Sequence, residues 1–191
     1  MSAGPFVLPI HDLQRTPGAG RNIELAIPAP HDLGTSVIGV PEGELVELDL
    51  TVQSTGEGVY VTGTIGTRLT GECVRCLDPL DRRLDLDVSE LYLFPESVQR
   101  AIDDGDEEAT EMLRTDGETL DLEPMVRDTI VTDLPFRPLC RPDCPGLCPV
   151  CGIRMEDAEP GHEHREVDPR FAALAVLLEG ESEEGALEGG E

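Results

Sequence analysis

Apolar and polar residues alternate along three stretches of the chain, and this alternation constrains the fold more than any other feature. The stretches are residues 44–53, 59–69 and 80–88. A period of two places the apolar side chains of a strand on one face. A short turn at 55–58 joins the first two stretches, and residues 23–27 add a shorter strand before them. The pattern therefore predicts antiparallel β-strands with one face against a core.

Two helices are predicted after these strands. The first begins at Asp121, a residue type that caps helices, has Pro124 in its first turn and ends before Pro135. Its apolar stripe consists of Leu122, Val126, Ile130 and Leu134. The second helix is predicted to begin at Asp168, again followed by a proline, and to continue through Leu178.

The chain carries 40 acidic residues against 14 basic ones, all of them arginine, for a formal net charge of -26. Much of this charge lies in residues 96–123 and 179–191, which are studded with glycine and poor in large apolar residues. We predict a solvated loop and a disordered tail there. A charge this negative argues against a protein that holds nucleic acid mainly by neutralising phosphates. The acidic segments fit either a solubility device or an attraction for a basic partner.

No stretch is apolar enough to predict a membrane span, because the longest apolar run, residues 171–178, is far shorter than the about 20 residues required. The first residues also lack the basic start and long apolar region of a signal peptide. We therefore expect a cytoplasmic protein. In that reducing compartment, cysteines more often bind metal or carry out redox chemistry than form structural disulfides.

The six cysteines occur in two places. Cys73 and Cys76 follow a predicted strand, and the other four lie between residues 140 and 151. Within this window, Cys148-Pro-Val-Cys151 is followed by Gly152, which permits the positive φ of a tight turn. Two intervening residues allow both thiolates to reach one ion while backbone N–H groups point at the sulfurs. The sequence therefore predicts a metal-binding knuckle at Cys148 and Cys151.

Structural zinc takes four ligands, so the cysteines and two nearby histidines favour two zinc sites. The first predicted site joins the strand cysteines to the first two cysteines of the window: Cys73, Cys76, Cys140 and Cys144. The second joins the knuckle to the histidines that follow it: Cys148, Cys151, His162 and His164. An alternative remains open, in which the window 140–151 holds a single ion with four cysteines and the strand cysteines stay free or form a redox pair.

Neither site is predicted to be catalytic, because a catalytic zinc keeps one position open for water. A redox pair at Cys73 and Cys76 would open a helix after a strand, whereas another alternating strand follows here. His162 and His164 have an alternative interpretation as exposed loop residues among glutamates.

Together these patterns predict an α+β fold, with an antiparallel β-sheet core, two C-terminal helices and a zinc-knuckle segment. Residues 1–95 would form the β-rich body, and residues 96–118 an acidic disordered loop. Residues 119–179 would form a helix, the Cys/His segment and a C-terminal helix that packs on the body. Residues 180–191 would form a disordered acidic tail.

Four motifs carry a resemblance to a known family. They span residues 71–79 (GECVRCLDP), parts of 121–136, 138–152 (PLCRPDCPGLCPVCG) and 168–174 (DPRFAAL). With them the chain resembles the YceD family, whose bacterial prototype is called the large ribosomal RNA subunit accumulation protein. Relatives with the long cysteine block often carry Cys-x-Cys where this chain has His162 and His164. Histidine also binds zinc, so this departure is compatible with a ligand role.

The resemblance implies a function in the synthesis, processing or stability of large-subunit (23S) ribosomal RNA. We expect a non-enzymatic ribosome-biogenesis factor that binds a basic ribosomal protein or rRNA-processing factor, with indirect contact to RNA. One alternative is direct RNA binding through a local arginine patch formed by Arg75, Arg82, Arg83, Arg137 and Arg141. A thiol- or zinc-dependent enzyme is the other alternative, which would need an open zinc position or a low-pKa cysteine.

Overall fold

The computed structural model describes residues 4–13 and 16–164, and the chain divides into two compact units. The N-terminal unit is Met1–Gly146 and the C-terminal unit is Leu147–Glu191. The sequence predicts the first helix and the whole Cys/His segment in one region, whereas the division after residue 146 falls inside the cysteine window.

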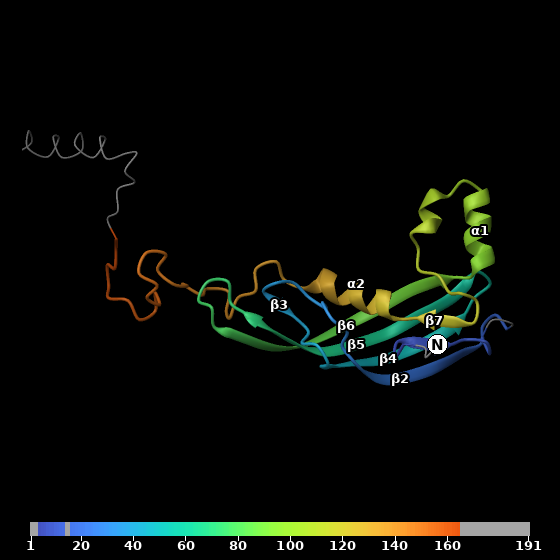
Figure 1. Ribbon diagram of the computed structural model, residues 1–191, viewed down its shortest axis with the longest axis horizontal. Helices are drawn as coiled ribbons and strands as arrows, with labels where there is room; N and C mark the ends of the chain where they lie inside the picture. Colours follow the sequence, from blue (N-terminus) through green and yellow to red (C-terminus); the bar gives the residue numbers. More distant parts are fainter. Residues whose placement is uncertain (1–3, 14–15, 165–191) are drawn as a thin grey trace, which may run out of the picture. The chain divides into compact units, whose positions relative to one another are not determined.

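A five-stranded antiparallel sheet forms the body of the N-terminal unit (Figure 1). Its strands are β2 (Gly20–Pro28), β3 (Ile38–Gly39), β4 (Leu45–Ser54), β5 (Gly58–Glu72) and β6 (Pro79–Leu93). β6 pairs with β5 along its whole length, so β4 and β3 share the other side of β5. β4 in turn pairs with β2. The predicted antiparallel sheet is confirmed, and β2, β4, β5 and β6 correspond to the four predicted strands.

The alternation along β4 places one side-chain face of the sheet in the core, as predicted. Val46, Leu48, Leu50 and Val52 are buried, and the residues between them are exposed. α2 (Glu123–Asp133) lies along this sheet, and its buried residues Met125, Val126 and Ile130 belong to the same core cluster (Figure 1). Burial of this stripe fixes the helix on the sheet, because each fully buried aliphatic side chain contributes about 1.5–3 kcal/mol.

The capping position of α2 lies one residue later than predicted. Leu122 occupies the capping position, while the carboxylate of Asp121 accepts a hydrogen bond from the backbone N–H of Glu123 at 3.0 Å. Asp121 also ends β7 (Thr119–Asp121), which pairs with β1 (Val7–Pro9) in a separate two-stranded sheet. These two strands were not predicted, because three-residue strands carry too few side chains to display a period.

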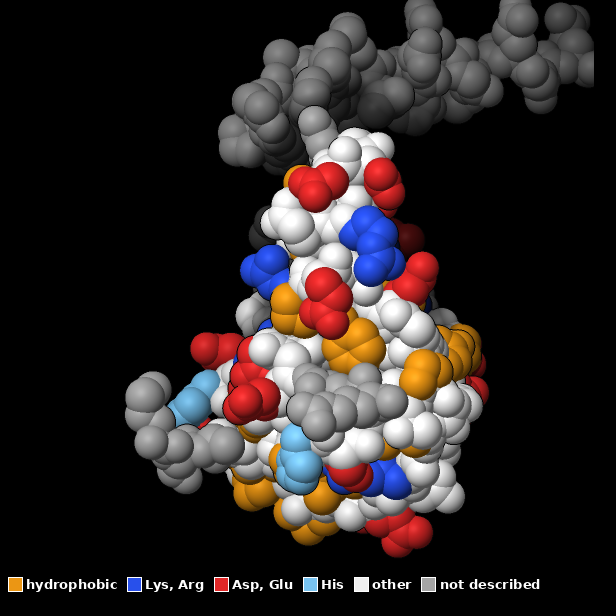
Figure 2. All heavy atoms as spheres, turned by 90° about the vertical axis from the view of Figure 1, so that its right-hand side faces the viewer, with side chains coloured by type: hydrophobic (Ala, Val, Ile, Leu, Met, Phe, Trp, Pro, Cys, Tyr) orange, Lys and Arg blue, Asp and Glu red, His pale blue; other side chains and the backbone are white. Residues whose placement is uncertain are grey.

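The acidic segment contains a helix where the sequence predicted a disordered loop. α1 (Pro95–Asp103) is followed by a short 3₁₀ helix, η1 (Glu107–Thr110). Val98 and Ala109 are buried, so a sparse apolar face packs inward while the acidic side chains remain in solvent. On the face drawn in Figure 2, acidic side chains are spread among arginines and apolar patches. The predicted second helix and the acidic tail lie outside the described residues.

The backbones of β4 and β5 approach each other closely at Gly63, where a side chain would not fit. Its φ is 150°, and a Cβ there would lie 2.0 Å from the carbonyl oxygen of Asp49. We expect Gly63→Ala to lower the free energy of unfolding by about 1–3 kcal/mol, because the strands must move apart. Gly56→Ala is the matched control: nothing lies within 4 Å of its Cβ position, and its effect should stay within about 0.5 kcal/mol. Urea unfolding followed by circular dichroism measures both, and equal effects would contradict the close approach.

Candidate metal centres

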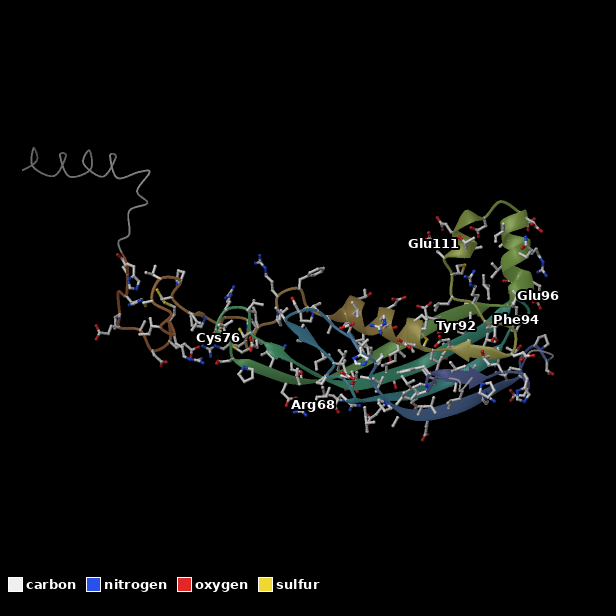
Figure 3. All side chains as sticks on the ribbon, in the orientation of Figure 1. Arg68, Cys76, Tyr92, Phe94, Glu96 and Glu111 are labelled. Atoms are coloured by element: carbon white, nitrogen blue, oxygen red, sulfur yellow. The ribbon has the colours of Figure 1, made fainter. Side chains whose placement is uncertain are left out.

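The turn between β5 and β6 positions Cys73 and Cys76 at one end of the sheet. The backbone N–H of Cys73 donates to the carbonyl oxygen of Asp78 at 2.8 Å, and the N–H of Leu77 donates to the carbonyl oxygen of Cys73 at 2.8 Å. Leu77 adopts a φ of 62°, a conformation in which a non-glycine residue is uncommon. Cys76 lies at this turn, whereas Tyr92 and Phe94 lie toward the other end of β6 (Figure 3).

The chain that leaves α2 runs beside this turn and supplies Cys140 and Cys144. The backbone N–H of Val74 donates to the carbonyl oxygen of Pro138 at 2.9 Å. Arg75 donates from Nη1 to the carbonyl oxygen of Cys144 at 2.7 Å, and Arg82 donates to the carbonyl oxygen of Leu139. These bonds attach two segments that are far apart in sequence, so the four cysteines meet in space.

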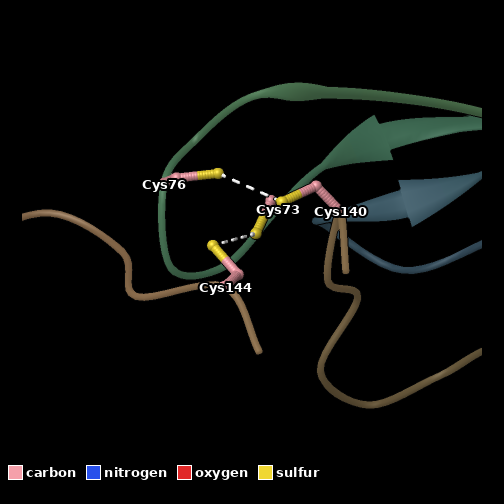
Figure 4. Close-up of side chains that lie close together, drawn as sticks. All are labelled: Cys73, Cys76, Cys140 and Cys144. Atoms are coloured by element: carbon pink, nitrogen blue, oxygen red, sulfur yellow. Dashed lines mark hydrogen bonds between the residues drawn. The ribbon is translucent and has the colours of Figure 1, made fainter. Parts of the chain in front are cut away.

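The four thiols of this cluster face one another (Figure 4). Their sulfur atoms all lie within 4.8 Å of one another, with 3.8 Å between Cys73 and Cys144 and 3.6 Å between Cys76 and Cys140. Sulfurs bonded at about 2.3 Å to one tetrahedral zinc are about 3.8 Å apart, whereas a disulfide requires about 2.05 Å. The arrangement therefore matches a tetrahedral metal centre. Cys73, Cys76 and Cys144 are buried and Cys140 is half-buried.

Backbone hydrogen bonds favour the thiolate form at Cys73. Burial raises the pKa of this thiol, but N–H groups of Cys140, Cys76 and Arg75 point at the sulfur and lower its pKa to about 6. The pKa of Cys76 is raised: a backbone hydrogen bond from Asp78 lowers it, but burial and the neighbouring thiols together outweigh that bond. Burial, followed by the neighbouring thiols, also raises the pKa of Cys140, so Cys76 and Cys140 both resist ionisation without a cation. A divalent cation would remove this conflict by stabilising every thiolate.

The second set of predicted ligands meets inside the C-terminal unit. Ligand atoms of Cys148, Cys151, His162 and His164 all lie within 4.8 Å of one another. The sulfur of Cys151 is 3.4 Å from Nε2 of His162, which is in turn 3.1 Å from Nε2 of His164. Mixed sulfur and nitrogen ligands at these separations suit a tetrahedral ion.

The predicted knuckle geometry is present around Cys148. The N–H of Gly152 donates to the carbonyl oxygen of Cys148 at 2.9 Å, and Gly152 has the expected positive φ, at 73°. N–H groups of Cys151 and Val150 point at the sulfur of Cys148 and lower its pKa to about 6. Among residues 147–164, Cys148 is the only buried residue. The described part of this unit therefore has no apolar core of its own.

The structure thus brings together the eight predicted ligands in the two predicted groups of four, and both groups could hold a metal ion. The alternative with one site at residues 140–151 is not the arrangement seen, because Cys140 and Cys144 face the strand cysteines. Zinc itself remains a prediction.

Of the predicted arginine patch, Arg75 and Arg82 bind backbone carbonyls, Arg83 pairs with Glu47 and Asp85, and Arg141 pairs with Asp143.

Two surface features were not predicted from the sequence: the exposed side chain of Phe136 and the outer edge of β6. Phe136 is fully exposed beside the segment that carries Cys140, although its neighbour Leu134 is buried. The predicted apolar stripe of the helix ends before Pro135, so its period does not indicate whether Phe136 packs against the core. The edge of β6 depends on strand pairing over a long sequence separation, which periodicity does not specify.

These features define a small α+β protein with two candidate metal centres. A family model described as "Large ribosomal RNA subunit accumulation protein YceD" matches residues 61–178. The chain belongs to the YceD family, as the motifs had indicated. No helix among the described residues is long and apolar enough to cross a membrane.

Curated relatives cover most of the chain. An uncharacterised protein of Mycobacterium tuberculosis, Rv2926c, is 43% identical over 95% of this chain and 85% of its own length. An uncharacterised protein of Mycobacterium leprae is 36% identical over 91% of this chain and 78% of its own length. The uncharacterised protein YlbN of Bacillus subtilis is 26% identical over 63% of this chain and 66% of its own length. No solved structure matches the chain.

Proposed function

We propose that this protein is a non-enzymatic ribosome-biogenesis factor that supports the accumulation of large-subunit 23S ribosomal RNA. The observation that carries the proposal is the family match, which spans both candidate metal centres, β6 and most of β5. The protein acts by binding a basic ribosomal protein or rRNA-processing factor.

Both clusters are structural zinc centres in this proposal. Sulfur and imidazole ligands are those that zinc prefers, and each cluster supplies four of them. Four protein ligands complete the tetrahedron and leave no position for a reacting water. The first zinc links the β5–β6 turn to the segment after α2, and the second orders residues 147–164. The alternative of a thiol-dependent enzyme is disfavoured because three of the six thiols are buried within the first cluster.

A basic partner is favoured by the charge of the chain. The formal net charge is -26, and four of the five arginines of the predicted patch already bind carbonyl or carboxylate oxygens. An acidic protein of this kind attracts basic segments of ribosomal proteins and masks cations that would otherwise bind RNA non-specifically. Contact with RNA is then indirect.

Depletion of the protein in its own host tests the proposal. We expect the ratio of 23S to 16S ribosomal RNA to fall, and re-expression of the full chain to restore it. The Cys73→Ser chain should fail to restore the ratio, while the Val74→Ala chain, altered at an exposed residue of the same turn, should succeed. An unchanged ratio after depletion would contradict the function.

A further inference from the structure

One edge of the main sheet has no partner strand in the part of the chain that the structure describes. β6 pairs with β5 on one side from Pro79 to Leu93, and no strand among the described residues pairs with its other side. The end of this outer side is covered: Leu93 donates to the carbonyl oxygen of Leu113 at 2.9 Å and accepts from the N–H of Thr115 at 3.0 Å. An open edge presents backbone donors and acceptors to another extended chain.

The direction of these groups follows from the register. In an antiparallel strand, successive residues direct their N–H and C=O groups to alternate sides. The backbone N–H and C=O groups of Leu93 point outward, away from β5, whereas the N–H of Phe94 donates inward to the carbonyl oxygen of Glu57. The pairing of β6 with β5 contains no bulge. Asp87, Ser89 and Leu91 therefore also point their backbone groups away from β5.

A groove of about 760 Å³ runs along this open edge. Residues 86–91 of β6 form one wall, while α2 and residues 111–113 form the other. This volume lies within the range of about 300–1,000 Å³ that is usual for ligand sites. Leu86, Leu91 and Leu113 are half-buried in its lining, and Met112 is exposed. The groove thus offers backbone hydrogen bonds together with apolar contact.

The charged side chains that line the groove all have the same sign. They are Asp87, Glu90, Glu111, Asp128 and Asp133. No arginine or histidine lines it, and none of these carboxylates forms an ion pair with another residue of the part that the structure describes. An occupant with positive side chains would relieve their mutual repulsion.

We propose that an extended basic peptide segment binds in this groove and adds to the sheet as a strand beside β6. Its backbone would pair with Asp87, Ser89 and Leu91. Its arginine or lysine side chains would reach the carboxylates of Glu90 and Asp128, and its apolar residues would contact Met112 and Leu113. This proposal deepens the proposed function, on which it rests, because it assigns the surface that holds the basic partner and the conformation in which it is held.

Two other occupants fit the charge less well. Residues 165–191 of the same chain carry eight acidic residues and two arginines, so they would add repulsion. A second copy of the protein would bring the same five carboxylates to the groove edge to edge. Either occupant would block binding of the test peptide. A second copy would also make the protein a dimer in solution.

A defined peptide tests the hydrogen bonds along the edge. The probe is a twelve-residue peptide of alternating arginine and valine, and the protein is the full chain. Ser89→Pro removes one outward N–H from an edge strand, where proline is tolerated. We expect its affinity for the peptide to fall roughly tenfold or more, while Ser89→Ala stays within about twofold. Fluorescence anisotropy measures the affinities, and thermal unfolding checks that both variants fold.

The probe itself provides a second measurement that does not depend on the folding of Ser89→Pro. A peptide N-methylated at alternate residues cannot donate to β6 and should also bind roughly tenfold more weakly than the unmodified peptide. Binding of the unmodified peptide should slow hydrogen exchange at the amides of Asp87 and Leu91. Equal affinity for both peptides, or unchanged exchange at these amides, would overturn the strand addition.

The electrostatic contribution has its own matched pair of variants. Glu90→Gln with Asp128→Asn should weaken peptide binding by roughly tenfold at low salt and by less at high salt. The control is Glu24→Gln with Asp49→Asn, which removes the same charge from exposed positions on β2 and β4. Equal loss in both double variants would show attraction by net charge alone and would overturn the site.

The two levels of the proposal fail in different ways. If the peptide binds at β6 but depletion of the protein leaves the 23S to 16S ratio unchanged, the docking site stands and the proposed function fails. If depletion lowers the ratio but Ser89→Pro restores it fully and binds the peptide normally, the function stands and the docking site fails.

Discussion

Replacing His162 with alanine is expected to abolish the ordered structure of residues 147–164 while the sheet remains folded. In this part of the chain Cys148 is the only buried residue, so apolar burial cannot hold the loops in place. The apparent binding free energy of structural zinc is about 10–16 kcal/mol in small domains and is then the main source of stability. Loss of one of four ligands removes most of it. Amide hydrogen exchange, compared between the two units, measures the effect.

His31→Ala is the matched control for this substitution, because His31 is exposed and far in sequence from either cluster. Its exchange pattern should equal that of the unaltered protein. A chelator should reproduce the His162→Ala pattern in residues 147–164. If these residues keep their protection after chelation, the C-terminal unit is ordered by something other than a metal, and this part of the account is wrong.

Replacing Cys73 with serine is expected to give the largest loss of stability within the N-terminal unit. Cys73 is fully buried, and its sulfur lies 3.8 Å from that of Cys144. Serine is a poor zinc ligand and leaves a polar hydroxyl among thiols in a buried site. The free energy of unfolding should fall by roughly 4 kcal/mol or more, a size typical of losing a metal site. Urea unfolding followed by circular dichroism gives the value.

The control for Cys73→Ser comes from the same turn. Val74 is 40% exposed, so Val74→Ala should change the free energy of unfolding by no more than about 0.5 kcal/mol. Both variants keep the backbone bond from Val74 to Pro138 that attaches the turn to the chain after α2. A loss as small in Cys73→Ser as in Val74→Ala would show that the four thiols do not act together.

The strands and α2 were predictable because their residues follow a period that burial enforces. Along β4 a slip by one residue would bury Asp49, so the pattern specifies both the strand and its inward face. α1 was not predictable in the same way. Its apolar side consists of little more than Val98 and Ile102 among acidic residues, and composition alone indicated disorder. Pro95 in the first turn of α1 is typical of a helix start, but the acidic composition of the segment favoured a loop.

The candidate metal centres were predictable by residue type, but spacing left the grouping open. Two groupings of the cysteines satisfied the same ligand count, and only the position of the β5–β6 turn beside Pro138 distinguishes them. The open edge of β6 was beyond the reach of periodicity. Its groove exists because β4 and β3 both pair with the other side of β5, which is a property of the assembled sheet.

The metal content of the purified full chain tests the central claim most directly. Native mass spectrometry should show two zinc ions on each chain. Cys73→Ser and His162→Ala should each lose one ion, and the variant that carries both substitutions should lose both. Thiol alkylation should leave all six cysteines of the unaltered protein unmodified until a chelator is added. A chain that carries no metal, with six thiols that react at once, would contradict the account.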